Sequence, residues 1–579
     1  MVEIQEKLNT AVGLHQSGRI DEAVGLYNQV LEQDPDNVNA CYLLGVIAYQ
    51  ALKLDKAVDY LKKAILIAPS DYLYKYLAEI YVDKEDVVNA IKCYLKAVEL
   101  NPNDNELFYN LGVLYHKDNS QNEAVKCYLK AIELNNNHNK AYYNLGQILL
   151  QNKNIDEAIS CFQRVIELDY QDPEGYFSIA QAYKEQNNFD KALLYYQEVI
   201  NLNPYYTNAY FFAGYIFEQQ NMPEQALKYY QKVIELEPDS SDAHYNMGNI
   251  LLNTGKIKET VNYFEKAMSL DPDNPLKQYS LGCAYLLTEN FSKGWELFEV
   301  RIKLFKHHSL KLSSTPKWNG ESLKDKVIYL YTVAGFGDSL LFLRYIPLLK
   351  DMGAKVLLKT RSGLEELFRQ SNLDIEIIEE NYPDELIICD YQLPMMSLPY
   401  LFKANTDTIP STEGLLKVNE RKHQEYKEKY FNNDCLKVGI AWYTHTSAKR
   451  SVNLEHFYPL AQIPNVKVYS LQKDIRVSKG TNIIDIAENF HDFTDTTAAI
   501  KNLDVLITID SALSHVGGIL NIPTWVLLPC PSDWRWLLGR EDSPWYKSVR
   551  LFRQKDFDNW DNVIQDVIKN IMEMSKKCI

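Results

Sequence analysis

A sequence period of about 34 residues runs through the first half of this chain of 579 residues. Each period opens with a small residue, and a second small residue follows twelve positions later. A large, mostly aromatic residue stands four positions further on, and a proline closes six of the units. The opening residues are Ala11, Gly45, Ala78, Gly112, Gly146, Ala180, Gly214, Gly248 and Gly282. Nine such units constrain the fold strongly, because a repeated sequence folds as a repeated structure.

The pattern predicts pairs of helices. Small residues let the two helices of a unit approach closely, the aromatic residue fills the gap to the next unit, and the proline ends the second helix. A period of 34 residues with this pattern is that of tetratricopeptide repeats. Residues 1–305 are therefore predicted to form an α solenoid of about nine repeats, whose groove, lined by the first helices, suits an extended protein segment.

Composition narrows the class of protein and of partner. The chain has no apolar run long enough to span a bilayer and no signal peptide at its start, so we expect a cytoplasmic protein without a transmembrane segment. A net charge of −16 argues against nucleic acid and favours a basic or neutral protein segment as partner. The nine cysteines lack metal-ligand spacing, so we expect reduced thiols and no metal site.

The period ends after Phe298, and residues 306–324 form a polar linker. Apolar, β-branched runs then alternate with helical segments. This order predicts two doubly wound α/β halves, 325–420 and 421–579, with a cleft between them and a final helix over 560–574. The predicted strands are 327–331, 355–359, 375–378 and 386–389 in the first half, and 436–442, 466–471, 505–509 and 524–528 in the second.

Ligands of such sheets bind where strands end and helices begin. After the first strand, Gly335 and Gly337 permit a tight turn, and Asp338 follows them. Asp338 is either a catalytic base that faces the cleft or a residue that caps the next helix.

A second turn of this kind follows the strand 505–509. It contains Asp510, Ser511, Ala512, Leu513 and His515. With Ser511 as N-cap, the first free amides of the helix would point outward, which is the usual geometry of a diphosphate site. His515 would lie on the same side and donate to a phosphate oxygen, or it is a core histidine bonded to the backbone.

Several passages of the second half, in this order, resemble one enzyme family. They are residues 335–338, 438–442, 470–473, 492–495, 510–515 and 533–546. Together they cover most of residues 325–555, and they are similar to glycosyltransferase family 9, the ADP-heptose:lipopolysaccharide heptosyltransferase-like proteins of the GT-B class. The resemblance is strongest to the bacterial subgroup that fuses such a domain to tetratricopeptide repeats.

The resemblance implies transfer of a sugar from a nucleotide-sugar donor without a metal or another cofactor. It assigns the acceptor to the first half, with Asp338 as general base, and the donor to the second half. The loop of Asp510, Ser511, Ala512 and His515 would hold the diphosphate and ribose. Gln472, Phe493 and Thr494 would form the wall of the base site. The final helix would cross back to brace the first half, as in GT-B enzymes.

A metal-free enzyme must meet the charge of the leaving diphosphate with amides and cations. Lys449 and Arg450 are the expected cations, or else a solvated basic pair. The loop that holds them, 443–451, departs from the asparagine- and arginine-rich pattern expected there. Trp534, Arg535 and Trp536 would form the floor of a sugar site or stack on a base, or one of the tryptophans belongs to the core.

The repeats suggest how an acceptor arrives. In plan, though not in its catalytic motifs, the chain also resembles O-GlcNAc transferase, in which groove asparagines clasp the acceptor backbone. Asn110, Asn144 and Asn246 stand two residues before the glycine of their repeats, where they would face the groove, or their placement is chance.

Three functions follow. The first, which we favour, is a glycosyltransferase whose acceptor, such as a protein, is recruited by the repeats. The second is a repeat scaffold for protein–protein interaction with an inactive GT-B part. The third is a lipopolysaccharide or surface-glycan glycosyltransferase, for which the stretch 393–402 would supply an apolar surface.

Overall fold

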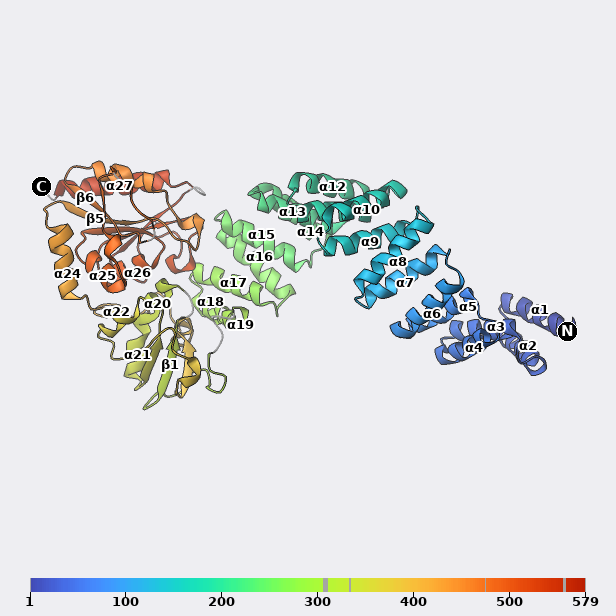
Figure 1. The fold of residues 1–579 in the computed structure, drawn as a ribbon. Helices are drawn as coiled ribbons and strands as arrows, with labels where there is room; N and C mark the ends of the chain where they lie inside the picture. The colour runs from blue at the N-terminus through green and yellow to red at the C-terminus, as the bar shows by residue number, and fades with distance from the viewer. Residues whose placement is uncertain are drawn as a thin grey trace. The chain divides into compact units, whose positions relative to one another are not determined.

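The computed structural model describes residues 2–305, 311–332, 335–473, 475–478, 480–555 and 559–577. Part of the predicted linker, residues 306–310, lies outside the described residues. The chain forms two compact units, Met1–Asn221 and Met222–Ile579 (Figure 1). The division falls within the repeats, so the second unit contains the last repeats together with the α/β part.

The first unit consists of helical pairs, as the sequence period predicts. Its helices are α1 (Val2–Gln16), α2 (Ile20–Gln33), α3 (Val38–Gln50), α4 (Leu54–Ile67), α5 (Asp71–Asp83), α6 (Val87–Leu100), α7 (Asn105–Lys117), α8 (Gln121–Leu134), α9 (Asn139–Gln151), α10 (Ile155–Leu168), α11 (Pro173–Glu185), α12 (Phe189–Leu202) and α13 (Thr207–Gln219). The prolines that close the units lie just beyond the second helices, where a missing N–H costs no helical hydrogen bond.

The small opening residues act within their own repeat. A Cβ atom added to Gly146 would come within 2.6 Å of the Phe162 ring, and one added to Gly112 within 2.7 Å of the Tyr128 ring. The aromatic residue of the second helix therefore packs directly on the glycine of the first helix. Tyr128 also packs with Ala141 and Leu145 of the next repeat, so it fills both spaces rather than only the gap between units.

The second unit begins with the last repeats. Its first helices are α14 (Pro223–Leu236), α15 (Ser241–Asn253), α16 (Ile257–Leu270), α17 (Pro275–Leu287), α18 (Phe291–Phe298) and α19 (Arg301–Leu304). Helix α18 is short, and its buried Phe291, Trp295 and Phe298 belong to the same hydrophobic core as the α/β part. The last repeat is thus packed as part of the α/β unit.

The first α/β half, called the N-half, contains a parallel sheet in the order β3-β2-β1-β4. The strands are β1 (Val327–Tyr331), β2 (Lys355–Lys359), β3 (Glu376–Ile378) and β4 (Tyr391–Pro394). The helical segments are α20 (Phe336–Phe342), η2 (Leu343–Tyr345), α21 (Ile346–Asp351), α22 (Glu365–Arg369), η3 (Asp384–Leu386), η4 (Met395–Ser397) and α23 (Leu398–Leu401).

The predicted strand 386–389 is wrong, because pairing with β1 starts later. The Asp390 carboxylate accepts a hydrogen bond from the Val327 amide at 2.8 Å, so the first ladder pair joins Ile328 to Tyr391. Upstream, Ile388 is 89% exposed. The apolar run 386–389 therefore begins at the last residue of η3 and ends before β4. The other seven predicted strands are present within one residue of their expected bounds.

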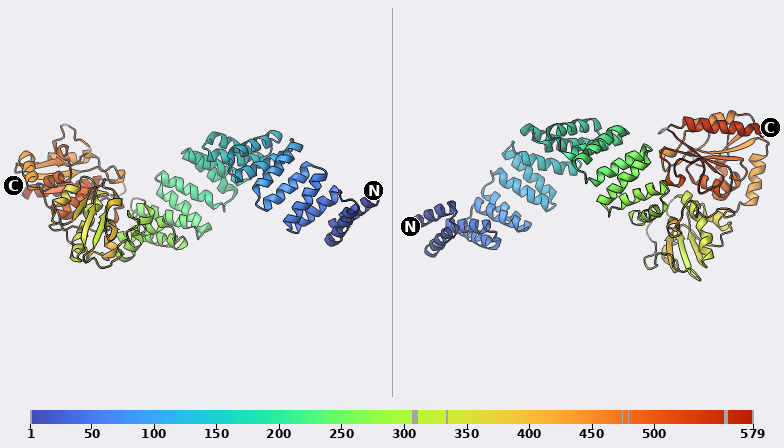
Figure 2. Two further views of the ribbon diagram at one scale, coloured as in Figure 1. Left: turned by 60° about the horizontal axis from the view of Figure 1, so that its bottom comes forward. Right: turned by 180° about the vertical axis from the view of Figure 1, so that it is seen from behind.

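The second half, called the C-half, contains a parallel sheet in the order β10-β9-β8-β5-β6-β7. Figure 2 shows this half in orange to red. Its strands are β5 (Leu436–Ala441), β6 (Val466–Ser470), β7 (Ile483–Asp485), β8 (Val505–Ile509), β9 (Thr524–Leu528) and β10 (Val549–Arg553). The helical segments are α24 (Glu420–Tyr426), η5 (Lys427–Phe431), η6 (Ala448–Arg450), η7 (Leu454–Gln462), η8 (Ala487–Asn489), α25 (Phe493–Ile500), α26 (Ala512–Ile519), η9 (Trp534–Trp536) and α27 (Asp561–Lys577). The outer strands β7 and β10 were not predicted.

Two further expectations are corrected. Helix α27 does not brace the N-half: its buried Val563, Val567 and Ile571 belong to the core of the C-half, against η7 and β10. The stretch 393–402 is not an apolar surface, because Leu393 and Leu398 are fully buried in the shared core. Both differences have the same physical reason. Apolar side chains are more stable out of water, so these segments pack against neighbouring elements.

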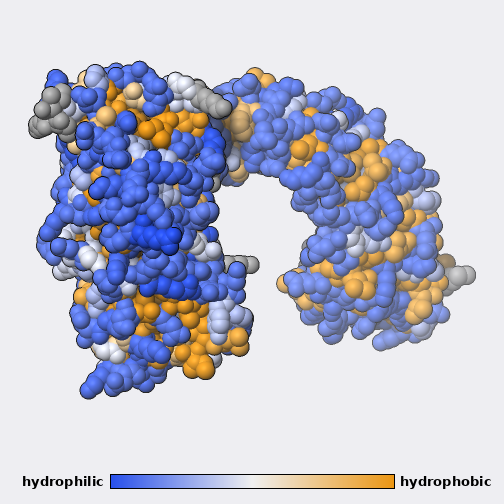
Figure 3. Space-filling view, turned by 60° about the vertical axis from the view of Figure 1, so that its left-hand side comes forward, coloured by the Kyte–Doolittle hydropathy of each residue, from blue (hydrophilic) through white to orange (hydrophobic). Residues whose placement is uncertain are grey.

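Among the helices of the described residues, none combines the length and the apolar character that crossing a bilayer requires. The face drawn in Figure 3 is mostly hydrophilic, and its hydrophobic residues form separate patches.

Candidate functional site

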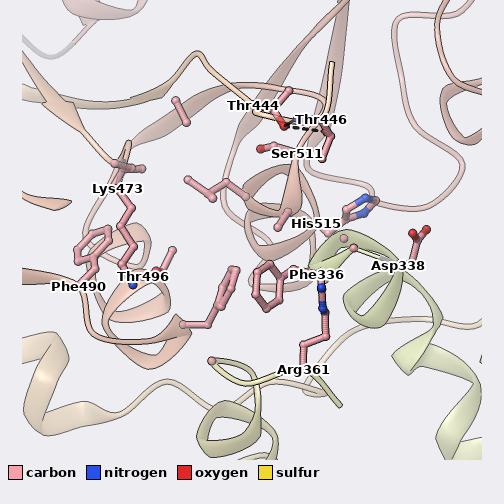
Figure 4. Close-up of a pocket in the computed structure, with 18 of the residues that line it drawn as sticks. Phe336, Asp338, Arg361, Thr444, Thr446, Lys473, Phe490, Thr496, Ser511 and His515 are labelled. Atoms are coloured by element: carbon pink, nitrogen blue, oxygen red, sulfur yellow. Dashed lines mark hydrogen bonds between the residues drawn. The ribbon is translucent and has the colours of Figure 1, made fainter. Parts of the chain in front are cut away.

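A cavity of about 1080 Å³ lies between the N-half and the C-half. Each sheet has one switch point, where the order of strands along the chain changes direction. It lies between β1 and β4 in the N-half and between β5 and β8 in the C-half. A ligand crevice forms outside the carboxyl ends of strands at such a switch point. The turns after β1, β5 and β8 all line the cavity, so it joins the switch points of both sheets (Figure 4).

Asp338 lies in the first turn of α20 and lines the cavity. The N-cap of α20 is Gly335, so the alternative that Asp338 is the cap is wrong. The Asp338 carboxylate instead accepts a short hydrogen bond from the Arg535 guanidinium of η9. This ion pair joins the two halves, and only 16% of the Asp338 side chain is exposed.

His515 on α26 is buried beside this pair and lines the cavity. Its Nδ1 lies 3.0 Å from the Tyr546 hydroxyl, and its ring stacks on Trp536. Burial lowers the pKa of His515 well below its usual range, and the Arg535 and Arg344 guanidinium groups act in the same direction. The imidazole is therefore neutral. Burial raises the pKa of Tyr546 to about 12, so its hydroxyl keeps its proton. When this hydroxyl donates to Nδ1, the ring proton of His515 is on Nε2.

The two halves approach closely at Gly337. A Cβ atom there would lie 3.0 Å from the His515 ring, so glycine at this position permits contact between α20 and α26. Gly335, by contrast, has no neighbour within 4 Å of where its Cβ would be; it is the N-cap of α20 and also lines the cavity.

Asp510 holds the end of β8 in place. Its Oδ1 accepts a hydrogen bond from Trp536 Nε1 at 2.9 Å, and its Oδ2 lies 3.3 Å from Arg450 Nη1. Burial, reinforced by the nearby Asp533 charge, raises the pKa of Asp510. Asp510 thus acts mainly on its protein neighbours, although it also lines the cavity.

Ser511, Ala512 and Leu513 open helix α26 and line the cavity. Ser511 is the N-cap, as predicted, but its side chain caps no amide; its hydroxyl lies 3.1 Å from that of Thr508. The first amides of a helix have no partner within the helix. They are therefore available to an anion at this wall, where Figure 4 places Ser511 beside Thr444 and Thr446.

The two predicted cations, Arg450 and Lys449, differ in their position relative to the cavity. Arg450 lines the cavity and donates to the Asp510 carbonyl and to the Thr446 hydroxyl. Lys449 is exposed and is not among the residues that line the cavity. Only Arg450 therefore faces the site.

Two of the three residues predicted for the base wall line the cavity. Gln472 does, and its Oε1 accepts from the Trp442 and Tyr443 amides, so its Nε2 is the group left to donate. Phe493 does also, with its ring 5.0 Å from Phe336 of the N-half. Thr494 does not: it is buried and hydrogen-bonded to Lys422 and Asp492, because Asp492 caps α25.

The tryptophans of η9 are not ligand platforms. Trp534 packs against Trp295 and Phe298 of the last repeat, and Trp536 is fully buried against His515. Core packing is thus their role. Arg535 alone faces the cavity, where it donates to Asp533 at 2.7 Å and to Asp338.

Other cavity residues were not predicted. Phe336, Arg361 and Lys473 follow the ends of β1, β2 and β6 (Figure 4). Their position after a strand is the sequence signal that indicates them. Lys473 Nζ donates to the His491 carbonyl at 3.3 Å, which leaves further donors for a ligand.

The three asparagines of the predicted ladder have different surroundings. Asn144 and Asn246 donate to the hydroxyls of Tyr128 and Tyr230 in the preceding repeats, so these side chains link successive repeats. Asn110 is half-buried at the same position of α7. A groove of about 380 Å³ between α9 and α11 is lined instead by other residues, among them Tyr143, Gln147, Leu150, Phe177 and Gln181.

The described residues contain no group of three or more His, Cys, Asp or Glu side chains placed to hold a metal ion. Cys93 and Cys127 are buried within the repeats, as small core residues are.

Comparison with known families identifies the repeats. Models described as TPR repeat match residues 78–119, 114–153 and 214–255, and models described as tetratricopeptide repeat match residues 14–80, 140–169, 173–206 and 241–274. The chain therefore contains tetratricopeptide repeats. All of these matches lie before the α/β part.

Among curated proteins, Protein FlbA of Caulobacter vibrioides is 23% identical over 311 residues, which are 47% of this chain and 50% of FlbA. The chain thus spans about half the length of the curated relative it matches.

Three solved structures illustrate the structural likeness. MamA is 27% identical over 30% of this chain and 94% of its own, with a TM-score of 0.28. YrrB, described as a TPR protein with an unusual peptide-binding site, is 25% identical over 32% of this chain and 96% of its own, with a TM-score of 0.29. The C-terminal part of a TPR repeat-containing protein from Cytophaga hutchinsonii is 20% identical over 41% and 97%, with a TM-score of 0.37.

Proposed function

We propose that the cavity between the two halves binds a nucleotide-sugar and transfers its sugar to an acceptor, while the repeats recruit a protein partner. One observation carries the proposal: the amides of Ser511 to Leu513, the Arg450 guanidinium and the Asp338–Arg535 pair all line one cavity at the switch points of two parallel sheets. Helix amides and cations together suit a diphosphate.

In the proposed reaction an acceptor hydroxyl attacks the anomeric carbon of the sugar. The new C–O bond forms as the bond to the diphosphate oxygen breaks, and the diphosphate leaves with the bonding electrons. Asp338 receives the hydroxyl proton. Arg450, the α26 amides and the Nε2–H of His515 are the donors placed to meet the charge of the leaving group.

Tetratricopeptide repeats make the chain a scaffold for protein–protein interaction. Within the first unit we assign the contact to the groove between α9 and α11. Tyr143 and Phe177 occupy equivalent repeat positions there and supply aromatic surface. Gln147 and Gln181 also repeat, and an amide side chain can both donate to and accept from a peptide backbone.

The test is calorimetry of the full chain with ADP, UDP, GDP, dTDP and their sugar conjugates. We expect one nucleotide to bind saturably, and Arg450→Gln to weaken it about tenfold or more through loss of a charge-assisted contact. Lys449→Gln is the matched control: it removes the neighbouring charge outside the cavity and should leave the affinity unchanged. No binding to any nucleotide, or equal effects of both variants, would reject the proposed site.

A second candidate is a scaffold whose cavity is catalytically inactive. It is favoured by the ion pair that engages Asp338, because this carboxylate already has a protein partner in Arg535. Release of nucleoside diphosphate in the presence of donor and partner protein distinguishes the two. Release that Asp338→Asn abolishes supports transfer, and nucleotide binding without release supports the scaffold.

A further inference from the structure

The loop after β9 brings three parts of the second unit together. Its helix η9 contains Trp534, Arg535 and Trp536, and a 3₁₀-helix turns once in three residues. Successive side chains therefore point about 120° apart. Trp534 contacts the last repeat, Arg535 reaches the N-half, and Trp536 contacts Asp510 and His515 of the C-half.

The repeat side of this junction is aromatic and closely packed. The ring centroids of Trp295 and Phe298 lie 5.2 Å and 5.6 Å from that of Trp534, with the rings edge to face. All three side chains are buried. Helix α17 also contacts η9, and a Cβ atom on Gly255, after α15, would lie 3.6 Å from Cys530 at the start of the loop.

Trp295 also contacts the N-half. Its Nε1 donates to the Ala404 carbonyl at 2.8 Å. The Arg535 guanidinium lies over the Trp534 ring, with its carbon 4.4 Å from the ring centroid, and reaches Asp338 from there. One indole of the last repeat therefore supports the surface on which the cavity guanidinium rests.

We propose that Trp295 and Phe298 of the last repeat are positioning residues of the cavity. They act through Trp534, which carries Arg535 and so sets where its guanidinium meets Asp338. The last repeat is then a working part of the site as well as the end of a partner-binding array. This inference rests on the proposed function for what the cavity binds. The effect of Trp295 on the position of Arg535 can be tested independently of that function.

The test follows the reactivity of Arg535 in the full chain. Phenylglyoxal modifies accessible guanidinium groups, and mass spectrometry reports the rate at the peptide that contains Arg535. We expect Trp295→Ala to raise this rate about tenfold, because removal of the indole lets the loop open more often. Trp318 is an equally buried tryptophan whose ring packs on Phe402 of the N-half, so Trp318→Ala is the matched control and should not change the rate.

A milder variant protects the test against loss of folding. Trp295→Phe keeps a ring against Trp534 and removes the bond to Ala404, so it should raise the rate by less than Trp295→Ala does. Calorimetry with inorganic pyrophosphate gives the second readout, in which affinity should fall in the order wild type, Trp295→Phe, Trp295→Ala.

The outcomes separate the two claims. Unchanged Arg535 reactivity in both Trp295 variants, or an equal rise in Trp318→Ala, overturns the positioning role. Raised reactivity in a chain that binds neither pyrophosphate nor any nucleotide supports the positioning role and rejects the proposed function.

Discussion

At the scale of single residues, the cavity depends on charges that are removed from water. Asp338, Arg535 and Asp533 form a carboxylate–guanidinium–carboxylate row, and His515 is held neutral beside it. A second cation at His515 would add to the repulsion around Arg535 and Arg344. In a buried site, a neutral His515 beside an arginine that is paired with carboxylates has a lower electrostatic free energy than a protonated His515 would have.

This arrangement predicts how stability depends on pH. His515 has its lowered pKa only in the folded state, so below the unfolded value of about 6.5 the unfolded chain binds the proton and the folded chain does not. Its contribution to stability is present above about pH 6.5 and falls as the pH decreases, by up to about 1.4 kcal/mol per unit. His515→Asn should flatten this slope.

The measurement is urea unfolding followed by tryptophan fluorescence. All eight tryptophans lie in the second unit, so the signal reports on that unit. The raised pKa of Asp510 acts in the opposite direction, but it is present in both chains and cancels in the comparison. Equal slopes for wild type and His515→Asn would contradict the prediction.

At the scale of elements, the helical pair is decided by the small residue of its first helix. Gly146 brings α9 against Phe162 of α10, which is fully buried. Gly25 of α2, in contrast, has no neighbour within 4 Å of where its Cβ would be. The two glycines thus differ in their packing. Gly146 permits close contact between two helices, whereas Gly25 makes no such contact.

Alanine at these glycines should therefore have opposite effects. Gly146→Ala forces the Phe162 ring to move and should destabilise the first unit by about 1–3 kcal/mol. Gly25→Ala gains helix propensity without a clash and should stabilise it by about 1 kcal/mol. Urea unfolding followed by circular dichroism measures both. Shifts of the two midpoints in the same direction would show that the glycines are not distinguished by packing.

At the scale of the whole molecule, the boundary between the two compact units does not coincide with the end of the repeat pattern in the sequence. The core of the α/β part includes Leu286, Leu287 and Trp295 from the last repeat, and the second unit begins at Met222. A fragment that starts after the repeats would leave Trp534 without Trp295 and Phe298.

Fragments test this directly. Residues 222–579 should unfold cooperatively, whereas residues 311–579 should unfold at lower urea concentration or aggregate. Each buried aromatic side chain that is lost lowers the free energy of unfolding by about 1.5–3 kcal/mol. Tryptophan fluorescence during urea unfolding compares the two. The same midpoint for both fragments would mean that the last repeat adds nothing to the α/β core.

The sequence by itself determined the features that depend on local pattern. The period of small residues predicted the helical pairs. Seven of the eight predicted strands are present, because buried strands have continuous apolar runs between turns. The turns at Gly335 and Asp510 line one cavity, as expected for turns that follow the carboxyl ends of strands at the switch points of their two sheets.

Only the tertiary structure decided which neighbour each side chain meets. Asp338 and Arg535 are 197 positions apart, and Trp295 is 109 positions from Ala404, so no local pattern relates them. Likewise, the turn of η9 sends Trp534 to the repeats and Arg535 to the cavity, although both stand in one short motif. The physical reason is that burial and charge pairing are set by whatever packs nearby, and in this chain those neighbours come from the last repeat and the opposite half.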